Sequence, residues 1–175
     1  VRGEQIADYT MTVRRFVYLT AQGKYLLVQW MAHHAHQTST IDLTLPPFEQ
    51  PETWYDDLRL AALPTPNGPQ ARVLDVAGLG GLHTGDGSFS AHVTDPLCPW
   101  NEGDWQFASV NGRLQVTPGG APQCQLSIQA LAALAYGAHD PGDFVVRGWG
   151  DPSAAAQDTM RRMFPPMIPH LHETF

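Results

Sequence analysis

The chain has 175 residues and a formal net charge of −7, and 43% of its residues are hydrophobic. That length fits one ordinary domain or slightly more, and the apolar fraction excludes disorder as the main state. The acidic excess argues against a nucleic-acid partner, which needs clustered lysine and arginine. No stretch approaches the roughly 20 apolar residues of a membrane span, and no apolar segment follows the N-terminus as in a signal peptide. We therefore expect a cytoplasmic protein with no membrane partner.

The first fifty residues predict a strand, a helix and a second strand. Residues 11–19 are rich in β-branched and aromatic residues, which is typical of a strand. Residues 21–36 carry apolar residues at helical spacing, with Leu27, Trp30, Met31 and His34 on the expected buried face. Residues 40–45 alternate as a strand does, before a pair of prolines. Such a unit usually forms a parallel βαβ pair, but it is too short for a complete α/β domain.

The proline-rich residues 63–70 predict a linker. Beyond it, six segments have strand composition: residues 71–76, 89–94, 105–110, 113–116, 123–128 and 144–147. Asn111 and Gly112 predict a hairpin turn, because both residues tolerate a positive φ. Residues 129–136 predict a helix that ends at Gly137. Asp151 and Pro152 predict the start of the last helix. The chain is thus expected to divide into an incomplete α/β piece, residues 1–62, and an α+β domain, residues 71–175.

The usual chemical motifs are weak or absent. The glycines of residues 78–81 lack the spacing of a dinucleotide-binding loop, so a plain turn is favoured. His33, His34 and His36 are not spaced to share one helical face, and no cysteine or acidic cluster apart from Glu173 accompanies His170 and His172. We therefore expect no metal site.

The cysteines and serines give no clear nucleophile. No G-x-S-x-G motif is present. Cys98, in a proline-rich turn, is better explained as a structural residue than as a nucleophile. Cys98 and Cys124 form no disulfide framework, and we expect both thiols to be reduced.

Two features leave alternatives open. Trp100 lies in a turn rich in proline, asparagine and glycine, where it either pins the turn from inside or forms an aromatic wall of a substrate cavity. The C-terminal tail is rich in proline and apolar residues, which predicts burial and would carry the α-carboxylate of Phe175 inward. A free α-carboxylate has a pKa of about 3.5 and is a poor base at neutral pH. Burial raises that pKa towards values that suit a general base, but from the residues alone a tail without a catalytic role is favoured.

Several segments, in their order and spacing, resemble one family of bacterial enzymes. These segments are Arg-Val-Leu-Asp-Val at residues 72–76, Thr-Asp at 94–95 with Pro-Trp-Asn-x-Gly at 99–103, the strand and helix of residues 126–137, Arg-Gly at 147–148, and the tail from Phe-Pro at 164–165 to Phe175. The chain resembles the C-terminal part of the enhanced intracellular survival (Eis) family of GNAT-type N-acetyltransferases. Members carry two GNAT-like regions followed by a sterol-carrier-protein-like α+β domain, an antiparallel sheet with helices on one side.

The resemblance implies that residues 71–175 are this last domain and residues 1–62 part of the second GNAT-like region. The chain would then be the C-terminal fragment of a longer enzyme, which agrees with the lack of an initial methionine. Acetyl-CoA would bind the missing N-terminal domain, so this fragment is expected to bind no cofactor and to be inactive alone. The expected partners are the N-terminal GNAT domains of the same protein, an amine acceptor and further copies of the chain in a homo-oligomer.

For the site, the resemblance implies that the C-terminal carboxylate of Phe175 is a catalytic general base. The acceptor would be an aminoglycoside or a lysine-type amine, with Trp100 and Glu173 as substrate-binding residues. Some members have an acidic residue directly before the terminal Phe, whereas here Glu173 stands one place earlier. Two other functions stay open: a stand-alone sterol-carrier-like domain that binds a lipid or small molecule, and a structural domain that supports an oligomer.

Overall fold

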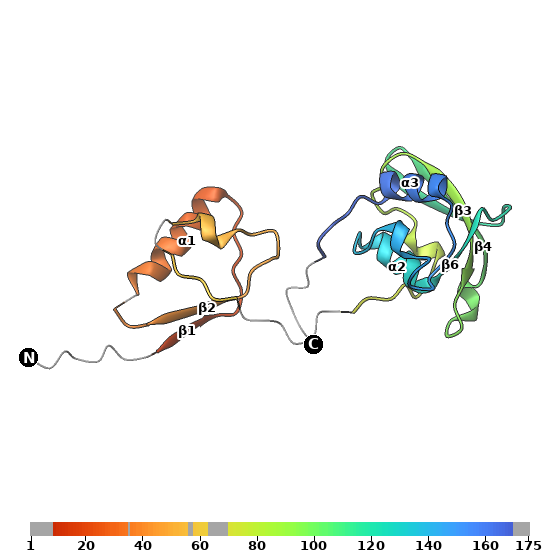
Figure 1. Cartoon of the computed structure of the whole chain (residues 1–175). Coiled ribbons are helices and arrows are strands. Elements are labelled where there is room, and N and C mark those ends of the chain that lie inside the picture. The colour runs from red at the N-terminus through yellow and green to blue at the C-terminus, as the bar shows by residue number, and fades with distance from the viewer. Residues whose placement is uncertain (1–8, 35, 56–57, 63–69, 170–175) are drawn as a thin grey trace, which may run out of the picture. The chain divides into compact units, whose positions relative to one another are not determined.

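The computed structural model describes residues 9–34, 36–55, 58–62 and 70–169. These residues form two compact units, one before residue 63 and one after residue 69 (Figure 1). Within the described part of the chain, no helix is long and apolar enough to cross a membrane.

The first unit is the expected strand–helix–strand arrangement. It contains strand β1 (Thr10–Val13), helix α1 (Ala21–His33) and strand β2 (Thr40–Leu43), and the two strands pair in parallel. The Thr20 hydroxyl caps α1 by accepting a hydrogen bond from the Gly23 amide at 3.0 Å. A small core of four buried side chains lies between helix and sheet: Phe16, Val28, Met31 and Trp54.

The first unit departs from the prediction in two ways. β1 ends at Val13 rather than near residue 19, since its partner β2 also ends at the paired residue Leu43. The predicted inner face of α1 is correct for Met31 but wrong for Leu27 and Trp30, which are 39% and 56% exposed. The side chains that pack inward are Val28 and Met31, because a two-stranded sheet covers only a narrow stripe of the helix.

The second unit is built on a four-stranded sheet. Its strands are β3 (Ser88–Thr94), β4 (Gly103–Val110), β5 (Arg113–Pro118) and β6 (Cys124–Ser127), in the order β5-β4-β3-β6. β3, β4 and β5 are antiparallel, whereas β6 runs parallel to β3. Asn111 and Gly112 have φ values of 53° and 72°, which confirms the predicted turn between β4 and β5.

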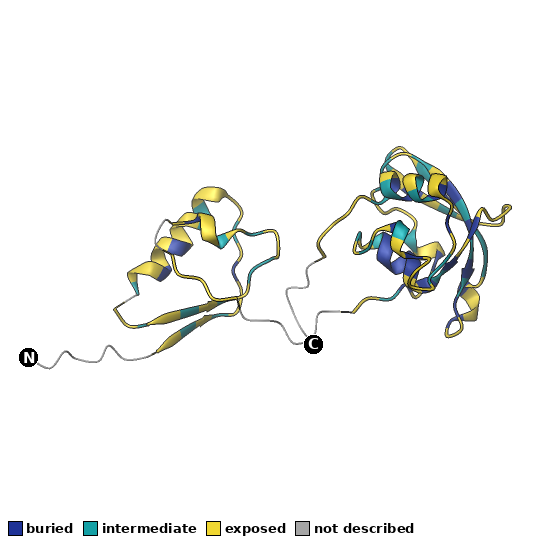
Figure 2. Cartoon of the chain, viewed as in Figure 1, coloured by how far each residue is buried: buried dark blue, intermediate teal, exposed yellow. Residues whose placement is uncertain are grey.

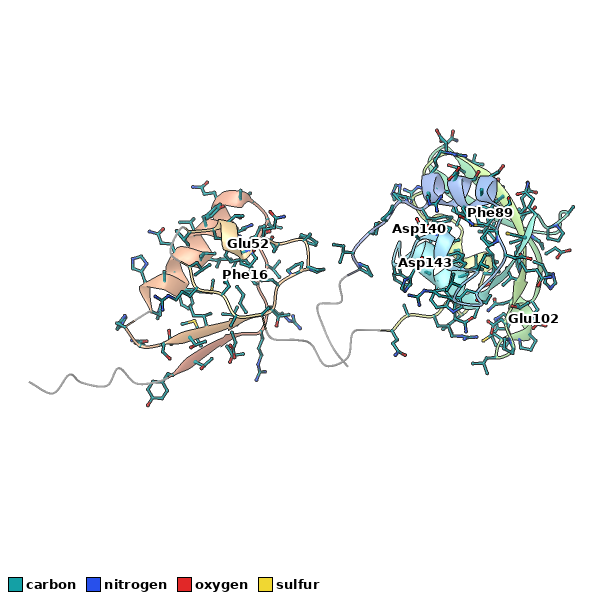
Figure 3. All side chains as sticks on the ribbon, in the orientation of Figure 1. Phe16, Glu52, Phe89, Glu102, Asp140 and Asp143 are labelled. Atoms are coloured by element: carbon teal, nitrogen blue, oxygen red, sulfur yellow. The ribbon has the colours of Figure 1, made fainter. Side chains whose placement is uncertain are left out.

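Two helices cover one face of this sheet, α2 (Ile128–Ala135) and α3 (Ala154–Met163) (Figure 1). Phe89, Ala91 and Val93 alternate inward along β3 and are at most 2% exposed, and Phe89 stacks on Phe107. Figure 2 shows where the buried residues of this unit lie, and Figure 3 labels Phe89. The same core takes in most of α2 together with Met160 and Met163 of α3. The α+β architecture with helices on one side of a sheet is therefore confirmed, although the sheet is not wholly antiparallel as expected, because β6 pairs with β3 in parallel.

Three local predictions in this unit need correction. Residues 71–76 and 144–147 are not strands, although both contain buried residues. The last helix is capped by Ser153 rather than by Asp151, whose carboxylate instead accepts a hydrogen bond from the Gln125 amide. α2 ends as predicted, with Gly137 at a φ of 59°.

Candidate functional site

A buried polar cluster joins residues 72–76 to the loop between β3 and β4. Asp95 and Asn101 are both 0% exposed. Asp95 Oδ1 accepts hydrogen bonds from the Leu97 and Cys98 amides at 3.2 and 3.1 Å and from the guanidinium of Arg72. Its other oxygen, Oδ2, accepts from Asn101 Nδ2 at 2.9 Å. Arg72, Asp95 and Asn101 are called the Asp95 cluster below.

Asn101 explains why residues 72–76 form no strand. Its Oδ1 accepts from the Val76 amide at 2.9 Å, and its Nδ2 donates to the Leu74 carbonyl at 3.2 Å. These backbone groups are therefore satisfied by a side chain instead of by a neighbouring strand. Burial alone would raise the pKa of Asp95, but the hydrogen bonds from Asn101, Cys98 and Leu97, together with the charge of Arg72, hold it below its usual value. The Asp95 carboxylate is thus ionised, and the Asp95 cluster holds residues 72–76 to the loop between β3 and β4.

Trp100 lies next to the Asp95 cluster, and its ring is exposed. Its side chain is 66% exposed, while its Nε1 donates to the Leu74 carbonyl at 2.9 Å. Leu74 and Leu97 are 65% and 74% exposed, and their backbones bond to the Asp95 cluster, so all three residues present apolar surface next to it. The hypothesis of a buried Trp100 that pins the turn is wrong. Trp105 is the partly buried tryptophan here, and its Nε1 donates to the Asn101 carbonyl at 2.9 Å.

Two hollows lie elsewhere on the described residues. In the second unit a hollow of about 270 Å³ is lined by Arg72 and Ala132 among others, and Trp100 is not among its lining residues. In the first unit a hollow of about 640 Å³ lies between α1 and the segment that carries Tyr55 and Arg59. The alternative that Trp100 forms the wall of a cavity therefore finds no support in either hollow.

The tail that leaves α3 is fixed to the domain by two backbone hydrogen bonds. The Gly85 amide donates to the Met163 carbonyl at 3.0 Å, at the last residue of the helix. The Met167 amide donates to the Gly137 carbonyl, also at 3.0 Å. Two predicted site residues, Glu173 and Phe175, lie outside the described residues.

The histidine rings at the end of α1 bond to backbone carbonyls of earlier residues in the helix. His33 Nδ1 lies 2.8 Å from the Gln29 carbonyl, and His34 Nδ1 lies 2.9 Å from that of Trp30. Among the residues that the structure describes, no group of three or more His, Cys, Asp or Glu side chains could hold a metal ion. His170 and His172 lie outside that part of the chain.

The other motifs have structural roles. Residues 78–81 belong to a turn that begins with a short 3₁₀ helix, Ala77–Leu79, as the spacing of their glycines predicts. Both cysteines are buried free thiols. Burial, with a smaller effect of the nearby Asp151 charge, raises the pKa of Cys124 to about 11, so this thiol stays protonated at neutral pH.

The sequence analysis singled out the segments that contain Arg72, Asp95 and Asn101, but it did not predict the hydrogen bonds that connect these residues. It also missed Gly85, where an added Cβ would lie 2.0 Å from the Arg162 carbonyl oxygen. A glycine inside a turn-rich stretch carries no signal of such a close approach. Gly137 was predicted as a helix stop, and its contact with the tail had no sequence signal either.

Comparisons with known proteins agree with this architecture. A family model described as "Sterol carrier protein domain" matches residues 81–172. The fold is similar to that of a GCN5-related N-acetyltransferase from Anabaena variabilis, with a TM-score of 0.69 and 20% identity over 95% of this chain and 44% of that one. It is also similar to Eis1 from Mycobacterium abscessus, with a TM-score of 0.71 and 18% identity over 97% of this chain and 44% of that one.

A GCN5-related N-acetyltransferase from Kribbella flavida matches a shorter part, with a TM-score of 0.52 and 22% identity over 59% of this chain and 28% of that one. No curated protein matches the chain. Since the coverage of the solved structures is 44% or less, the chain spans less than half of their length. At identities of 18–22%, the likeness establishes the fold.

Proposed function

The chain belongs to the sterol carrier protein domain family through residues 81–172, and from that premise we propose that it is the C-terminal part of a GNAT-type N-acetyltransferase of the Eis kind. The enzyme would transfer an acetyl group from acetyl-CoA to an amine such as an aminoglycoside or a lysine side chain. The observation that carries this proposal is that the likeness to two solved structures, the Anabaena acetyltransferase and Eis1, extends over 95% or more of this chain, across both of its units.

The first unit supports the expectation of further GNAT domains. Within the described residues, β1 and β2 pair only with each other. Parallel strands are normally part of larger sheets that are covered on both faces. The surface of this unit also carries large exposed apolar side chains, including Leu26, Trp30 and Phe48. We infer that these surfaces pack against the N-terminal GNAT domains of the same protein.

In the proposed reaction, acetyl-CoA supplies the thioester and would bind outside this chain. The α-carboxylate of Phe175 takes a proton from the acceptor ammonium, which leaves a neutral amine. The amine nitrogen then forms a bond to the thioester carbonyl carbon and loses a second proton to water, the carbon–sulfur bond breaks, and the departing thiolate takes a proton from an acid outside this chain. Glu173 would attract the cationic acceptor, and the exposed ring of Trp100 offers a face for a cation–π contact. The net charge of −7 favours the approach of a cation.

The packing of the second unit argues against a stand-alone lipid carrier. Several large apolar side chains of its core are less than 2% exposed, among them Phe107, Phe144, Leu126, Met160 and Met163. Its hollow of about 270 Å³ is smaller than typical ligand pockets of about 300–1,000 Å³. A lipid tail would therefore find little room in the described part of this unit.

The proposal is tested on the protein encoded by the complete gene. Release of free CoA is followed with a thiol reagent while acetyl-CoA and an aminoglycoside or a lysine peptide are present. Two glycines appended after Phe175 move the carboxylate away and should reduce kcat at least 100-fold. The matched control carries the same two glycines at the N-terminus and should keep its activity, and Phe175→Ala should retain measurable transfer because the carboxylate remains.

Full activity of the C-terminally extended protein would show that the carboxylate is not the base. Binding of a fluorescent fatty acid without any acetyl transfer would favour the lipid-carrier alternative. For the 175-residue chain alone we expect no binding of acetyl-CoA in calorimetry, and a micromolar affinity would contradict the assignment of that site to another domain.

A further inference from the structure

Lys24 is the single lysine of the 175-residue sequence, and its ammonium group is held by several other side chains. It lies on α1, where its Nζ forms an ion pair with Glu49 Oε2 at 2.6 Å. Nζ also lies over three aromatic rings, 5.0 Å from the ring centroid of Trp54, 5.5 Å from that of Tyr18 and 5.9 Å from that of Tyr25. Only 17% of the Lys24 side chain is exposed. The ammonium is thus bound by a carboxylate and by cation–π contacts.

The Glu49 carboxylate depends on this contact in turn. Its side chain is 5% exposed, and its Oε1 accepts a hydrogen bond from the Tyr18 hydroxyl. If Nζ moved into solvent, the carboxylate would stay buried without this ion-pair partner. Such a loss is strongly unfavourable, because a buried charge then has neither its partner nor full hydration. The burial of Glu49 therefore opposes any movement of Lys24 towards solvent.

The contacts of Lys24 also join three segments of the first unit. Tyr18 follows β1, Lys24 belongs to α1, and Glu49 follows β2. Trp54, which is 8% exposed, belongs to the small core of this unit. Acetylation would convert the ammonium into a neutral amide, which removes the ion pair and the cation–π contacts together. A modified Lys24 would therefore weaken the packing of α1 on both segments.

We propose that Glu49 and the aromatic rings around Lys24 shield this lysine from acetylation, so that the chain is not an acceptor for its own enzyme. The inference rests on the proposed function, in which amines such as lysine side chains accept acetyl groups. Acetylation of Lys24 would form a bond between Nζ and the acetyl carbon and break the carbon–sulfur bond. The ammonium would give up two protons, one that ends on the CoA thiol and one that is released to water. Nζ offers a lone pair for this attack only after it has left the Glu49 carboxylate and lost a proton.

The shielding is tested first with a small reagent on the 175-residue chain. N-Hydroxysuccinimidyl acetate acylates accessible amines without an enzyme, and free Nα-acetyl-lysine in the same solution is the reference for a fully accessible amine. Mass spectrometry of peptides that contain Lys24 gives the rate of its acetylation. At pH 8 we expect Lys24 to react at least tenfold more slowly than the reference in the folded chain, and at a similar rate in urea. Equal rates for the folded chain and the reference would overturn the proposal.

A charge-removing variant tests the role of the carboxylate. Glu49→Gln keeps the shape of the side chain but removes its charge, so Lys24 should react at least tenfold faster than in the wild type. The matched control is Glu52→Gln, an exposed glutamate of the same segment that Figure 3 labels. The control should stay within twofold of the wild type. An unchanged rate in Glu49→Gln, or an equal increase in Glu52→Gln, would show that the Glu49 carboxylate does not protect Lys24.

If Glu49→Gln does not fold, a pair of surface variants decides. Tyr25 and Trp30 are both exposed aromatic residues of α1, at 45% and 56%. Tyr25 covers the ammonium, whereas the Trp30 ring packs against His34. Tyr25→Leu should raise the rate of Lys24 acetylation at least threefold, and Trp30→Leu should stay within twofold of the wild type. Equal rates in the two variants would overturn the proposal.

The complete protein separates this inference from the proposed function. With acetyl-CoA and a lysine peptide, the peptide should be acetylated while Lys24 stays unmodified. If the peptide and Lys24 are acetylated at similar rates, the shielding fails and the proposed function stands. If no amine is acetylated, the proposed function fails, and the reagent test still decides whether Lys24 is shielded.

Discussion

The contribution of the Asp95 cluster to the stability of the second unit can be tested with the variant Asp95→Asn. In Asp95→Asn the shape is kept, but one oxygen becomes an NH₂ group. The oxygen that remains must stay at the Oδ1 position, where it meets the Leu97 and Cys98 amides and Arg72. The new NH₂ group then faces Asn101 Nδ2, which lies 2.9 Å from Asp95 Oδ2 in the wild type.

Rotation of the Asn101 amide cannot relieve this contact. Its Oδ1 already accepts from the Val76 amide at 2.9 Å, and its Nδ2 donates to the Leu74 carbonyl at 3.2 Å. Either orientation therefore leaves a buried donor without an acceptor, which costs about 1–3 kcal/mol. For a domain of about 100 residues, each kcal/mol lowers Tm by roughly 4–8 °C.

The assay is urea unfolding of the 175-residue chain at pH 7, followed by tryptophan fluorescence, together with a thermal melt. The control is Asp104→Asn, since the Asp104 side chain is 42% exposed and faces only the half-exposed His92 across the sheet. We expect the control to lie within about 0.5 kcal/mol of the wild type. An Asp95→Asn variant as stable as the control would refute the reasoning.

The same variant predicts a pH dependence. The pKa of Asp95 is lower in the folded chain than its usual value, so its ionised form stabilises the fold above about pH 4, the value for an unfolded aspartate. As the pH falls below 4 and through the folded pKa, this contribution is lost. The stability difference between wild type and Asp95→Asn should therefore shrink in acid, and a difference that grows instead would contradict the sign.

Three further changes test other contacts. Arg161 donates to both carboxylate oxygens of Asp140 and lowers the pKa of that residue to about 2. Arg161→Met should therefore reduce Tm slightly at pH 7, since both side chains are more than a third exposed, and the loss should shrink as the pH falls from about 4 through 2. A loss of the same size at pH 2 as at pH 7 would exclude this ion pair as its cause. Cys124, with a pKa near 11, should resist iodoacetamide at pH 8 in the folded chain and react in urea, and rapid labelling of the folded chain would contradict its burial. Gly85→Ala should destabilise the chain by at least about 1 kcal/mol in urea unfolding, because its Cβ would overlap the Arg162 carbonyl; an unchanged midpoint would show that this end of α3 yields freely.

Local chemistry in the sequence predicted those features that depend on one or two neighbouring residues. The Asn111–Gly112 turn and the helix stop at Gly137 follow from the ability of these residues to adopt positive φ, and both are confirmed. The predicted start of α3 is wrong because of a tertiary contact. Asp151 is a good helix cap by type, but its carboxylate is engaged by the Gln125 amide, and Ser153 takes the capping role.

Predictions of strands failed where the hydrogen-bond partner is not a strand. Residues 71–76 have the composition of a strand, and Val73 and Val76 are buried as expected. Their backbone groups, however, bond to the side chains of Asn101 and Trp100. Composition reports burial and an extended shape, and it does not report which group completes the hydrogen bonds.

This distinction bears on how the family resemblance is used. Arg72, Asp95 and Asn101 belong to the segments that carry the resemblance, and in the structure their polar atoms bind one another and the nearby backbone. A buried cluster whose acceptors are already occupied has little left to offer a substrate. In this chain, these three residues therefore hold the fold together rather than offer groups for a reaction. For the proposed reaction, the groups to test are therefore exposed ones such as Trp100, together with the carboxylate of Phe175.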